Sequence, residues 1–162
     1  MEEEQFKKLI TLGMRTYDLE ITDTGKDQTI KEAHGFLLVY DISNRSSFEK
    51  IPELHNKICK AYAAAGDLSS TPPLPPAVLV VRNILNRNDE REVSTEHGRK
   101  EAERLGCEFR EVTGNTNVEG VFLAVVQLGV QHASRDIGMT GEGGANSWFT
   151  YLESCFGIEP IS

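Results

Sequence analysis

The chain has 162 residues, of which 39% are hydrophobic and 26% are charged. This length suffices for one domain with a buried core, and the composition is typical of a globular protein rather than a disordered one. The formal net charge is −8, and the lack of a basic stripe in the sequence argues against a nucleic-acid-binding protein.

Cysteine spacing and hydropathy predict the cellular compartment of the protein and its association with membranes. The three cysteines, Cys59, Cys107 and Cys155, lie far apart and form no C-x-x-C pair, so we expect a reducing, cytoplasmic environment. No apolar run approaches the roughly 20 residues that are needed to span a bilayer. Because Cys155 is not fourth from the end of the sequence, we also expect no encoded prenyl anchor.

The first predicted elements are strands. In KKLITLGMRTYDLEITD, two runs of alternating polar and apolar residues flank Gly13, which predicts an antiparallel hairpin. Residues 35–42, GFLLVYDI, are almost continuously apolar, as in a strand that is covered on both faces. Residues 77–81 and 107–112, AVLVV and CEFREV, predict two further strands.

Helical patterns separate these strands. Ser46 begins a capping box, S-S-F-E, and apolar residues at helical spacing follow it as far as Tyr62. Ser94 precedes a second predicted helix that ends at Gly106, and a third begins near Asn117. Alternating strands and helices predict an α/β domain with a largely parallel sheet and right-handed crossovers.

The composition changes toward the end of the chain. We therefore divide the sequence into a domain over residues 1–132, a Gly-rich linker over residues 133–147 and an aromatic segment over residues 148–162. The glycines of SRDIGMTGEGGANS are typical of a flexible connection. The segment WFTYLESCFGI is expected to dock either on the domain itself or on a partner.

Residues 21–28, ITDTGKDQ, admit two interpretations. Asp-Thr-Gly is how a retropepsin-like aspartic protease presents its catalytic carboxylate, here Asp23, which would share a proton with the carboxylate of a second copy. Those proteases are almost entirely β, whereas residues 46–62 and 94–105 are predicted helices. The protease therefore stays only a remote alternative.

Five segments over residues 3–131 follow one another in a familiar order. YDLEITDTGKDQ comes first, then HGFLLVYDISNRSSFEKI, PPAVLVVRN, VSTEHGRKEAERLGCEFREVTGN and TNVEGVFLAVV. Together these segments resemble the small GTPases of the Ras superfamily. The resemblance implies a three-layer, P-loop-NTPase-like G domain, in which a mostly parallel sheet is edged by an antiparallel hairpin.

The resemblance assigns several nucleotide-site positions in the stretch ITDTGKDQ. Asp23 and Thr24 match the family's magnesium-side Asp-Thr, which makes Asp23 a vestigial Mg²⁺ ligand. Gly25 stands where the family has Ala. Asp27 or, after a one-residue slip, Gln28 stands at the position that orients the attacking water.

The family's base-binding positions are occupied by less suitable residues. The matched positions are Arg82, Asn83, Leu85, Thr113, Gly114 and Asn115. Leu85 replaces an Asp that accepts hydrogen bonds from guanine, so buried donors of the base would stay unpaired at a cost of about 1–3 kcal/mol each. The later NRND, residues 86–89, is an alternative, displaced substitute.

The family's phosphate loop, G-x-x-x-x-G-K-[ST], does not occur in this sequence, although its amides, Lys and hydroxyl bind the phosphates and Mg²⁺. The resemblance therefore implies that the first strand, the phosphate loop and the first helix are missing. In the family's sheet that strand lies between the hairpin and the strand expected at residues 35–42. Either these neighbours pair directly, or a segment or partner fills the gap, or the isolated chain is unstable.

The preferred hypothesis is a pseudo-GTPase that acts in signalling through protein–protein interaction, with GTP binding and hydrolysis lost or strongly impaired and without a cofactor. The alternative is a truncated or atypical small GTPase that binds GTP or GDP with Mg²⁺ when complete. Glu3, Glu4 and Phe6 match the acidic and aromatic end of the family's effector region, and they either form an effector-like surface for a basic partner or are a frayed acidic terminus.

Overall fold

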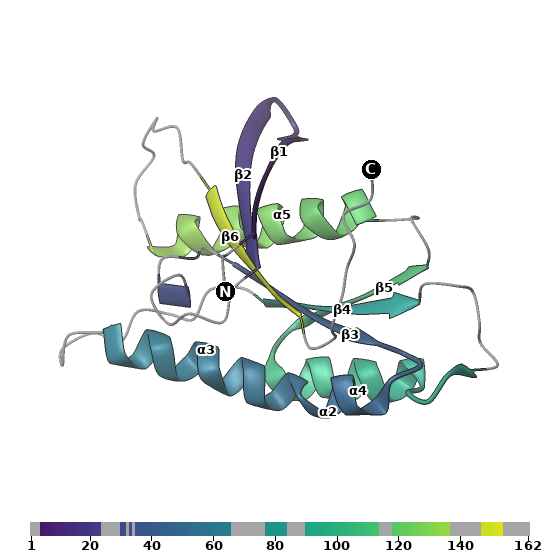
Figure 1. The fold of residues 1–162 in the computed structure, drawn as a ribbon. Helices are drawn as coiled ribbons and strands as arrows, with labels where there is room; N and C mark the ends of the chain where they lie inside the picture. Colours follow the sequence, from purple (N-terminus) through teal and green to yellow (C-terminus); the bar gives the residue numbers. More distant parts are fainter. Residues whose placement is uncertain are drawn as a thin grey trace.

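A computed structural model provides the fold of the chain (Figure 1). The structure describes residues 4–23, 30–31, 33, 35–65, 77–83, 90–113, 118–136 and 147–153. The strands are β1 (Glu4–Leu12), β2 (Arg15–Asp23), β3 (Phe36–Asp41), β4 (Ala77–Asn83), β5 (Glu108–Thr113) and β6 (Ser147–Glu153). The helices are α2 (Arg45–Glu49), α3 (Ile51–Ala65), α4 (Thr95–Leu105) and α5 (Val118–Asp136).

All these strands form one sheet in the order β1-β2-β6-β3-β4-β5. β1 and β2 are antiparallel and are joined at a turn in which Gly13 has φ 63°, a left-handed conformation that glycine adopts without steric cost. The pairs β2–β6, β6–β3, β3–β4 and β4–β5 are parallel. The sheet of the structure thus combines an antiparallel hairpin at one edge with parallel pairs between the other strands.

The position of β6 in the sheet is the main feature that could not be predicted from the sequence. β2 and β3 do not pair with each other, because β6 lies between them (Figure 1). Leu19 is in register with Ser147 on one side of β6, and Phe36 is in register with Thr150 on the other. Of the two expected positions of the aromatic segment, on the domain itself or on a partner, the structure has the first for residues 147–153, which form a strand of the same sheet.

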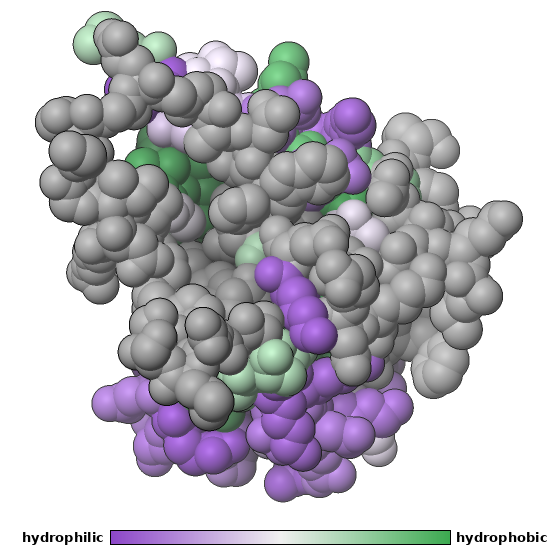
Figure 2. Space-filling view, turned by 90° about the vertical axis from the view of Figure 1, so that its left-hand side faces the viewer, coloured by the Kyte–Doolittle hydropathy of each residue, from purple (hydrophilic) through white to green (hydrophobic). Residues whose placement is uncertain are grey.

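Helices cover both faces of the sheet, so the domain has three layers (Figure 1). The side chains of β3 alternate between two cores, as expected for a strand that is buried on both faces. Phe36, Leu38 and Tyr40 belong to a core that α3 and α4 complete, whereas Leu37 and Val39 belong to a core with α5. Hydrophilic residues gather along the lower edge of the molecule in Figure 2, where α3 and α4 lie in Figure 1.

The first predicted helix is two helices in the structure. The N-cap of α2 is Asn44, whose side-chain Oδ1 accepts a hydrogen bond from the Ser47 backbone N–H at 3.2 Å. The expected capping box at Ser46 was wrong, because Ser46 already lies inside α2. The chain leaves α2 at Lys50, and Pro52 then lies in the first turn of α3, where its missing N–H costs no helical hydrogen bond.

The later helices agree better with the prediction. Ser94 is the N-cap of α4, and Gly106 ends this helix in a left-handed conformation with φ 70°. α5 extends to Asp136, so residues 133–136 are helical rather than part of the expected linker. Among the helices that the structure describes, none combines the length and the hydropathy that crossing a bilayer requires.

Candidate functional site

The carboxyl ends of five parallel strands meet at one edge of the sheet, the usual location of ligand sites in open α/β sheets. The last residues of these strands are Asp23, Glu153, Asp41, Asn83 and Thr113, in the order of the strands across the sheet. This edge is therefore the candidate functional site.

The fold brings several of the predicted site residues together at this edge. Asn83 of β4 is in register with Thr113 of β5, so two base-binding positions from distant segments lie side by side. Arg82 lies one residue earlier on β4, in register with Asp41 of β3. Asp23 is in register with Tyr151 of β6 on one side.

The other predicted site residues lie outside the described residues. They are Glu3, Thr24, Gly25, Asp27, Gln28, Leu85, Gly114 and Asn115. Glu4 and Phe6 of the effector-like surface lie on β1, and the register places Glu4 opposite Asp23. Phe6 exposes 46% of its surface, which agrees with a residue available for contacts.

The structure adds Asp41 to the site, a carboxylate that the sequence analysis did not single out. Its Oδ1 accepts hydrogen bonds from the backbone N–H of Ser43 at 2.8 Å and from the Ser43 hydroxyl at 2.6 Å. The backbone N–H of Asp41 donates to Ser47 Oγ at 3.0 Å, and this hydroxyl donates to the Asn44 carbonyl at 2.7 Å. The sequence signal was the D-I-S after a buried strand, a pattern typical of an Asx turn.

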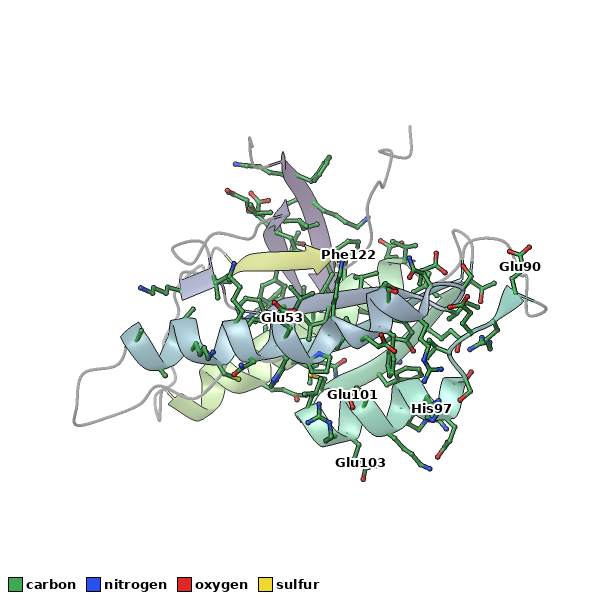
Figure 3. All side chains as sticks on the ribbon, turned by 60° about the horizontal axis from the view of Figure 1, so that its bottom comes forward. Glu53, Glu90, His97, Glu101, Glu103 and Phe122 are labelled. Carbon is green, nitrogen blue, oxygen red and sulfur yellow. The ribbon has the colours of Figure 1, made fainter. Side chains whose placement is uncertain are left out.

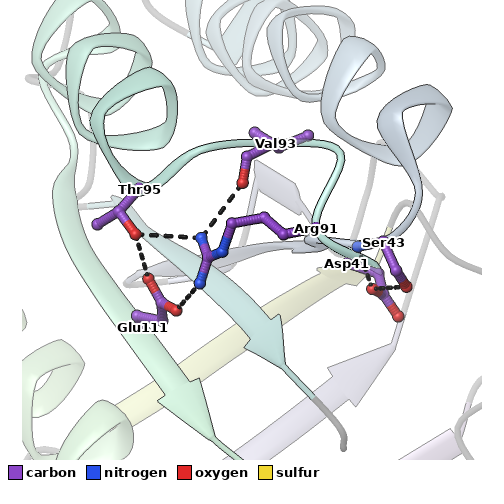
Figure 4. A network of polar contacts seen from close by, with 6 residues as sticks. All are labelled: Asp41, Ser43, Arg91, Val93, Thr95 and Glu111. Atoms are coloured by element: carbon purple, nitrogen blue, oxygen red, sulfur yellow. Dashed lines mark hydrogen bonds and ion pairs between the residues drawn. The ribbon is translucent and has the colours of Figure 1, made fainter. Parts of the chain in front are cut away.

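A second polar network lies beside this edge and joins the segment before α4 to β5 (Figure 4). Arg91 Nη1 donates to the Val93 carbonyl at 3.2 Å and to Thr95 Oγ1 at 3.1 Å, while Nη2 forms an ion pair with Glu111. Thr95 Oγ1 donates to Glu111 Oε2 at 3.1 Å. The carboxylate and the guanidinium satisfy each other, so the network positions α4 rather than offering a free acid or base.

The Tyr40 phenol is enclosed beneath α4. Burial raises the pKa of Tyr40 above its ordinary value, and its hydroxyl has no hydrogen-bond partner among the described groups. A Cβ atom added at Gly98 would lie 2.1 Å from this hydroxyl and 2.7 Å from the Phe109 ring. The close approach of α4 to β3 therefore requires glycine at position 98.

A third cluster of titratable groups joins α3 to α4 and to Cys107, which follows α4. Figure 3 labels one of its members, Glu101 on α4. Cys59 Sγ lies 3.7 Å from His55 Nδ1, and burial raises the pKa of the Cys107 thiol to about 11. A hydrogen bond from Arg104, with Nε 2.9 Å from Oε2, lowers the pKa of Glu101. A thiol with a raised pKa is a poor nucleophile, so Cys107 has a structural rather than a catalytic role.

Within the described part of the chain, no three His, Cys, Asp or Glu side chains converge to bind a metal ion. The resemblance suggests Asp23 as a vestigial Mg²⁺ ligand. The side chain of Asp23 is not among the described side chains, so this search does not include it. The described polar groups at the edge, Asp41, Arg91 and Glu111, are all engaged in hydrogen bonds within the fold.

Comparison with known proteins identifies relatives over most of the chain. A family model described as "Ras family" matches residues 1–130. Protein ras-2 of Neurospora crassa is 37% identical over 145 residues, which cover 77% of this chain and 63% of the relative. Ras-like protein 1 of Pyricularia oryzae is 34% identical (78% and 60% covered), and Ras-like protein rasW of Dictyostelium discoideum is 31% identical (78% and 59% covered). The chain thus spans about three fifths of the length of these relatives.

Proposed function

This chain belongs to the Ras family, and from that premise we propose that it is a pseudo-GTPase, which acts in signalling through protein–protein interaction and in which GTP binding and hydrolysis are lost or strongly impaired. The family membership and the α/β fold leave no place for the retropepsin-like protease, which is almost entirely β. The proposed function requires no cofactor.

The observation that carries this proposal is the identity of the strand between β2 and β3. The family's phosphate loop directly follows the strand that lies at this position of the sheet. In the present chain the strand at this position is β6, and the sequence after it is SCFGIEPIS. This sequence has one glycine, no lysine and an acidic residue, so it lacks the glycine pattern that turns backbone amides toward the phosphates and the lysine that supplies the cation.

The base-binding positions support the same conclusion. Asn83 and Thr113 lie side by side at the ends of β4 and β5, but the sequence continues from Asn83 to Ile84 and Leu85. A leucine cannot accept the hydrogen bonds that guanine donates, and each unpaired donor costs about 1–3 kcal/mol on burial. Phosphate and base recognition are therefore weakened at two separate places.

The exposed strand β1 supports the interaction part of the proposal. β1 is an edge strand of the sheet, and such an edge presents unpaired backbone groups to which a partner can add a strand. Leu9 and Phe6 expose 69% and 46% of their surface on this strand. Glu4 begins β1, and Glu3 precedes it in the sequence, so this end of the strand suits a partner that is apolar at its centre and basic at its rim.

A nucleotide titration tests the loss of GTP binding. We expect no saturable binding of fluorescent GDP or GTP analogues at micromolar concentration, with or without Mg²⁺, to a chain that unfolds cooperatively by circular dichroism. The variant Leu85→Asp restores an acceptor for the base and should still not bind, because it has no phosphate loop. Saturable, Mg²⁺-dependent binding by either form would contradict the proposal.

The interaction surface is tested separately with charge reversal. Partners are first captured with the unaltered chain and then titrated against Glu3→Lys/Glu4→Lys and against Glu103→Lys, a control on the exposed side of α4 (Figure 3). The proposal predicts weaker binding only for the variant at β1. Equal affinities of all three proteins for every partner would eliminate β1 as the effector-like surface.

The partial coverage of the relatives favours one second candidate. The chain spans 63% of protein ras-2, and Asp23 and Thr24 match the family's magnesium-side residues. An atypical small GTPase of which this chain is a part would bind GTP or GDP with Mg²⁺ when complete. Nucleotide binding by a longer form, but not by this chain, distinguishes this candidate from the pseudo-GTPase.

A further inference from the structure

Two thiols lie toward the same end of the layer that α3 and α4 form. Each of these helices connects one parallel strand to the next, so both run from the carboxyl end of the sheet back to its amino end. Cys59 lies in the second half of α3, and Cys107 follows the C-cap residue of α4. Both border one core, because Ile58 beside Cys59 is a member of it and Cys107 packs against it. After burial, the neighbouring Cys59 thiol is the largest cause of the raised pKa of Cys107.

The two thiols differ in their surroundings. Cys59 Sγ lies 3.7 Å from Nδ1 of His55, which precedes it by one turn of α3. Burial lowers the pKa of His55 below its usual 6.5, so the ring is neutral at pH 7, and Nδ1 accepts the thiol proton when Nε2 carries the proton of the ring. The Sγ of Cys107 instead donates to the Leu105 carbonyl at 3.8 Å. Cys59 is therefore the thiol that a neighbouring base can activate.

We propose that Cys59 and Cys107 form an oxidation site for hydroperoxides, in which Cys59 reacts first and Cys107 then closes a disulfide with it. Both thiols are free and partly exposed, so a small oxidant reaches Cys59 in the folded domain. A reactive thiol beside a second, resolving cysteine is the usual arrangement of a redox-sensing site. The disulfide joins α3 to the residue that precedes β5.

The reaction balances with hydrogen peroxide as the oxidant. In the first step the proton of Cys59 moves to His55, and the thiolate attacks one oxygen of the peroxide. The S–O bond forms, the O–O bond breaks, and the leaving hydroxide takes the proton back from His55 to become water. In the second step Cys107 attacks the sulfur of the Cys59 sulfenic acid, the S–S bond forms, and the S–O bond breaks. The hydroxide leaves with the proton of Cys107 as a second water, so the two thiols lose two electrons and the peroxide gains them.

Closure of the disulfide is expected to be the slow step. Burial raises the pKa of Cys107 to about 11, together with Cys59 on α3 and Glu101 on α4, the two titratable groups that act on it (Figure 3). Only a small fraction of Cys107 is therefore thiolate at neutral pH. Below the pKa this fraction rises about tenfold per pH unit, and the rate of closure should rise by the same factor between pH 6 and pH 9.

Peptide mapping of the oxidised full chain tests the site. Trypsin releases Cys59 in the peptide ICK, residues 58–60, and Cys107 in LGCEFR, residues 105–110. After treatment with an equimolar amount of hydrogen peroxide, we expect these two peptides of one molecule to be joined by a disulfide. Dimedone, which traps sulfenic acids, should label Cys59 in the variant Cys107→Ser and should leave Cys107 unlabelled in the variant Cys59→Ser. A disulfide only between different molecules, or labelling of Cys107 as fast as that of Cys59, overturns the site.

The role of His55 as the base is tested in the Cys107→Ser background, where only the first step occurs. Adding His55→Gln should slow the labelling of Cys59 by about a hundredfold, the lower end of what a positioned base contributes. Asn56→Gln, an exposed change at the next position of α3, is the matched control and should leave the rate unchanged. Circular dichroism verifies that both variants are folded. Equal rates in the two variants would overturn the assignment of His55 as the base.

Discussion

The two halves of the sheet are assembled in different ways. In the half that contains β3, β4 and β5, neighbouring strands are connected through helices: α2 and α3 lead from β3 to β4, and α4 leads from β4 to β5. In the other half, the hairpin β1–β2 is completed only by β6, whose Ser147 pairs with Leu19. The first half can form from neighbouring segments, whereas the second requires a contact across most of the chain, which is costly in loop-closure entropy.

The two halves nevertheless obey one rule of chain connection. α3 and α4 lie on one face where the chain advances from β3 to β5, and α5 lies on the other face where it returns from β5 to β6. Reversing both the direction and the face preserves the hand of the crossover, which is right-handed in nearly all parallel sheets. The position of β6 in the centre of the sheet is therefore topologically ordinary.

The largest loss of stability is expected from a substitution in β6, the strand that joins the hairpin β1–β2 to the rest of the sheet. Thr150 is paired on both sides, with Thr22 and with Phe36, so Thr150→Pro removes a ladder N–H in the centre of the sheet. We expect a loss of at least about 3 kcal/mol, because a lost bond and an unpaired carbonyl each cost about 1–3 kcal/mol. Urea unfolding followed by circular dichroism measures this loss, with Thr150→Val as the β-branched control. An unchanged midpoint for the proline variant would exclude β6 from the centre.

A smaller loss is expected within the local half, where α4 approaches β3. Gly98→Ala places a methyl group 2.1 Å from the Tyr40 hydroxyl, and overpacking of about 1–3 kcal/mol exceeds the gain of about 1 kcal/mol in helix propensity. We expect a net loss of up to about 2 kcal/mol in the free energy of unfolding. Tyr40→Phe removes the unpaired hydroxyl and should restore part of the loss in the double variant. Additive effects of the two changes would show that the residues do not touch.

The beginning of α2 offers a test at a single hydrogen bond. Asn44 caps this helix through Oδ1, so Asn44→Ala should lower the free energy of unfolding by about 1 kcal/mol. Ser46→Ala is the matched control and should change it by less than about 0.5 kcal/mol, because Ser46 is exposed inside the helix. Denaturant unfolding of both variants decides between the two caps, and a larger effect at Ser46 would reinstate the capping box.

The smallest effect concerns pH. Burial lowers the pKa of His55 below its usual 6.5, so the unfolded chain takes up this proton first as the pH falls. This contribution to stability is complete above about pH 7.5 and is lost as the pH falls toward the folded pKa. His55→Gln should therefore flatten the decrease of the urea midpoint between about pH 7.5 and pH 5.5. A decrease of the urea midpoint as steep in His55→Gln as in the unaltered chain would contradict this assignment.

The sequence predicted the residues of the candidate site only where these residues lie at the ends of strands. The positions of Asn83 and Thr113 followed from the order of the segments, and the sheet brings these residues together. Asp41 was not predicted as a site residue, because it lies within the apolar run 35–42. The sequence D-I-S nevertheless indicates a turn after a buried strand. The Arg91–Glu111 pair could not be predicted, since nothing in the sequence relates a residue before α4 to one on β5.

The amino-acid sequence by itself determined the elements whose signals are local. The alternation around Gly13, the apolar run of β3 and the cap at Ser94 each depend on residues within a few positions of one another. Only the tertiary structure decided which strand lies between β2 and β3, because parallel pairing is made by backbone groups that every residue except proline carries. Backbone pairing has no sequence code, so the place of residues 147–153 depended on the whole sheet.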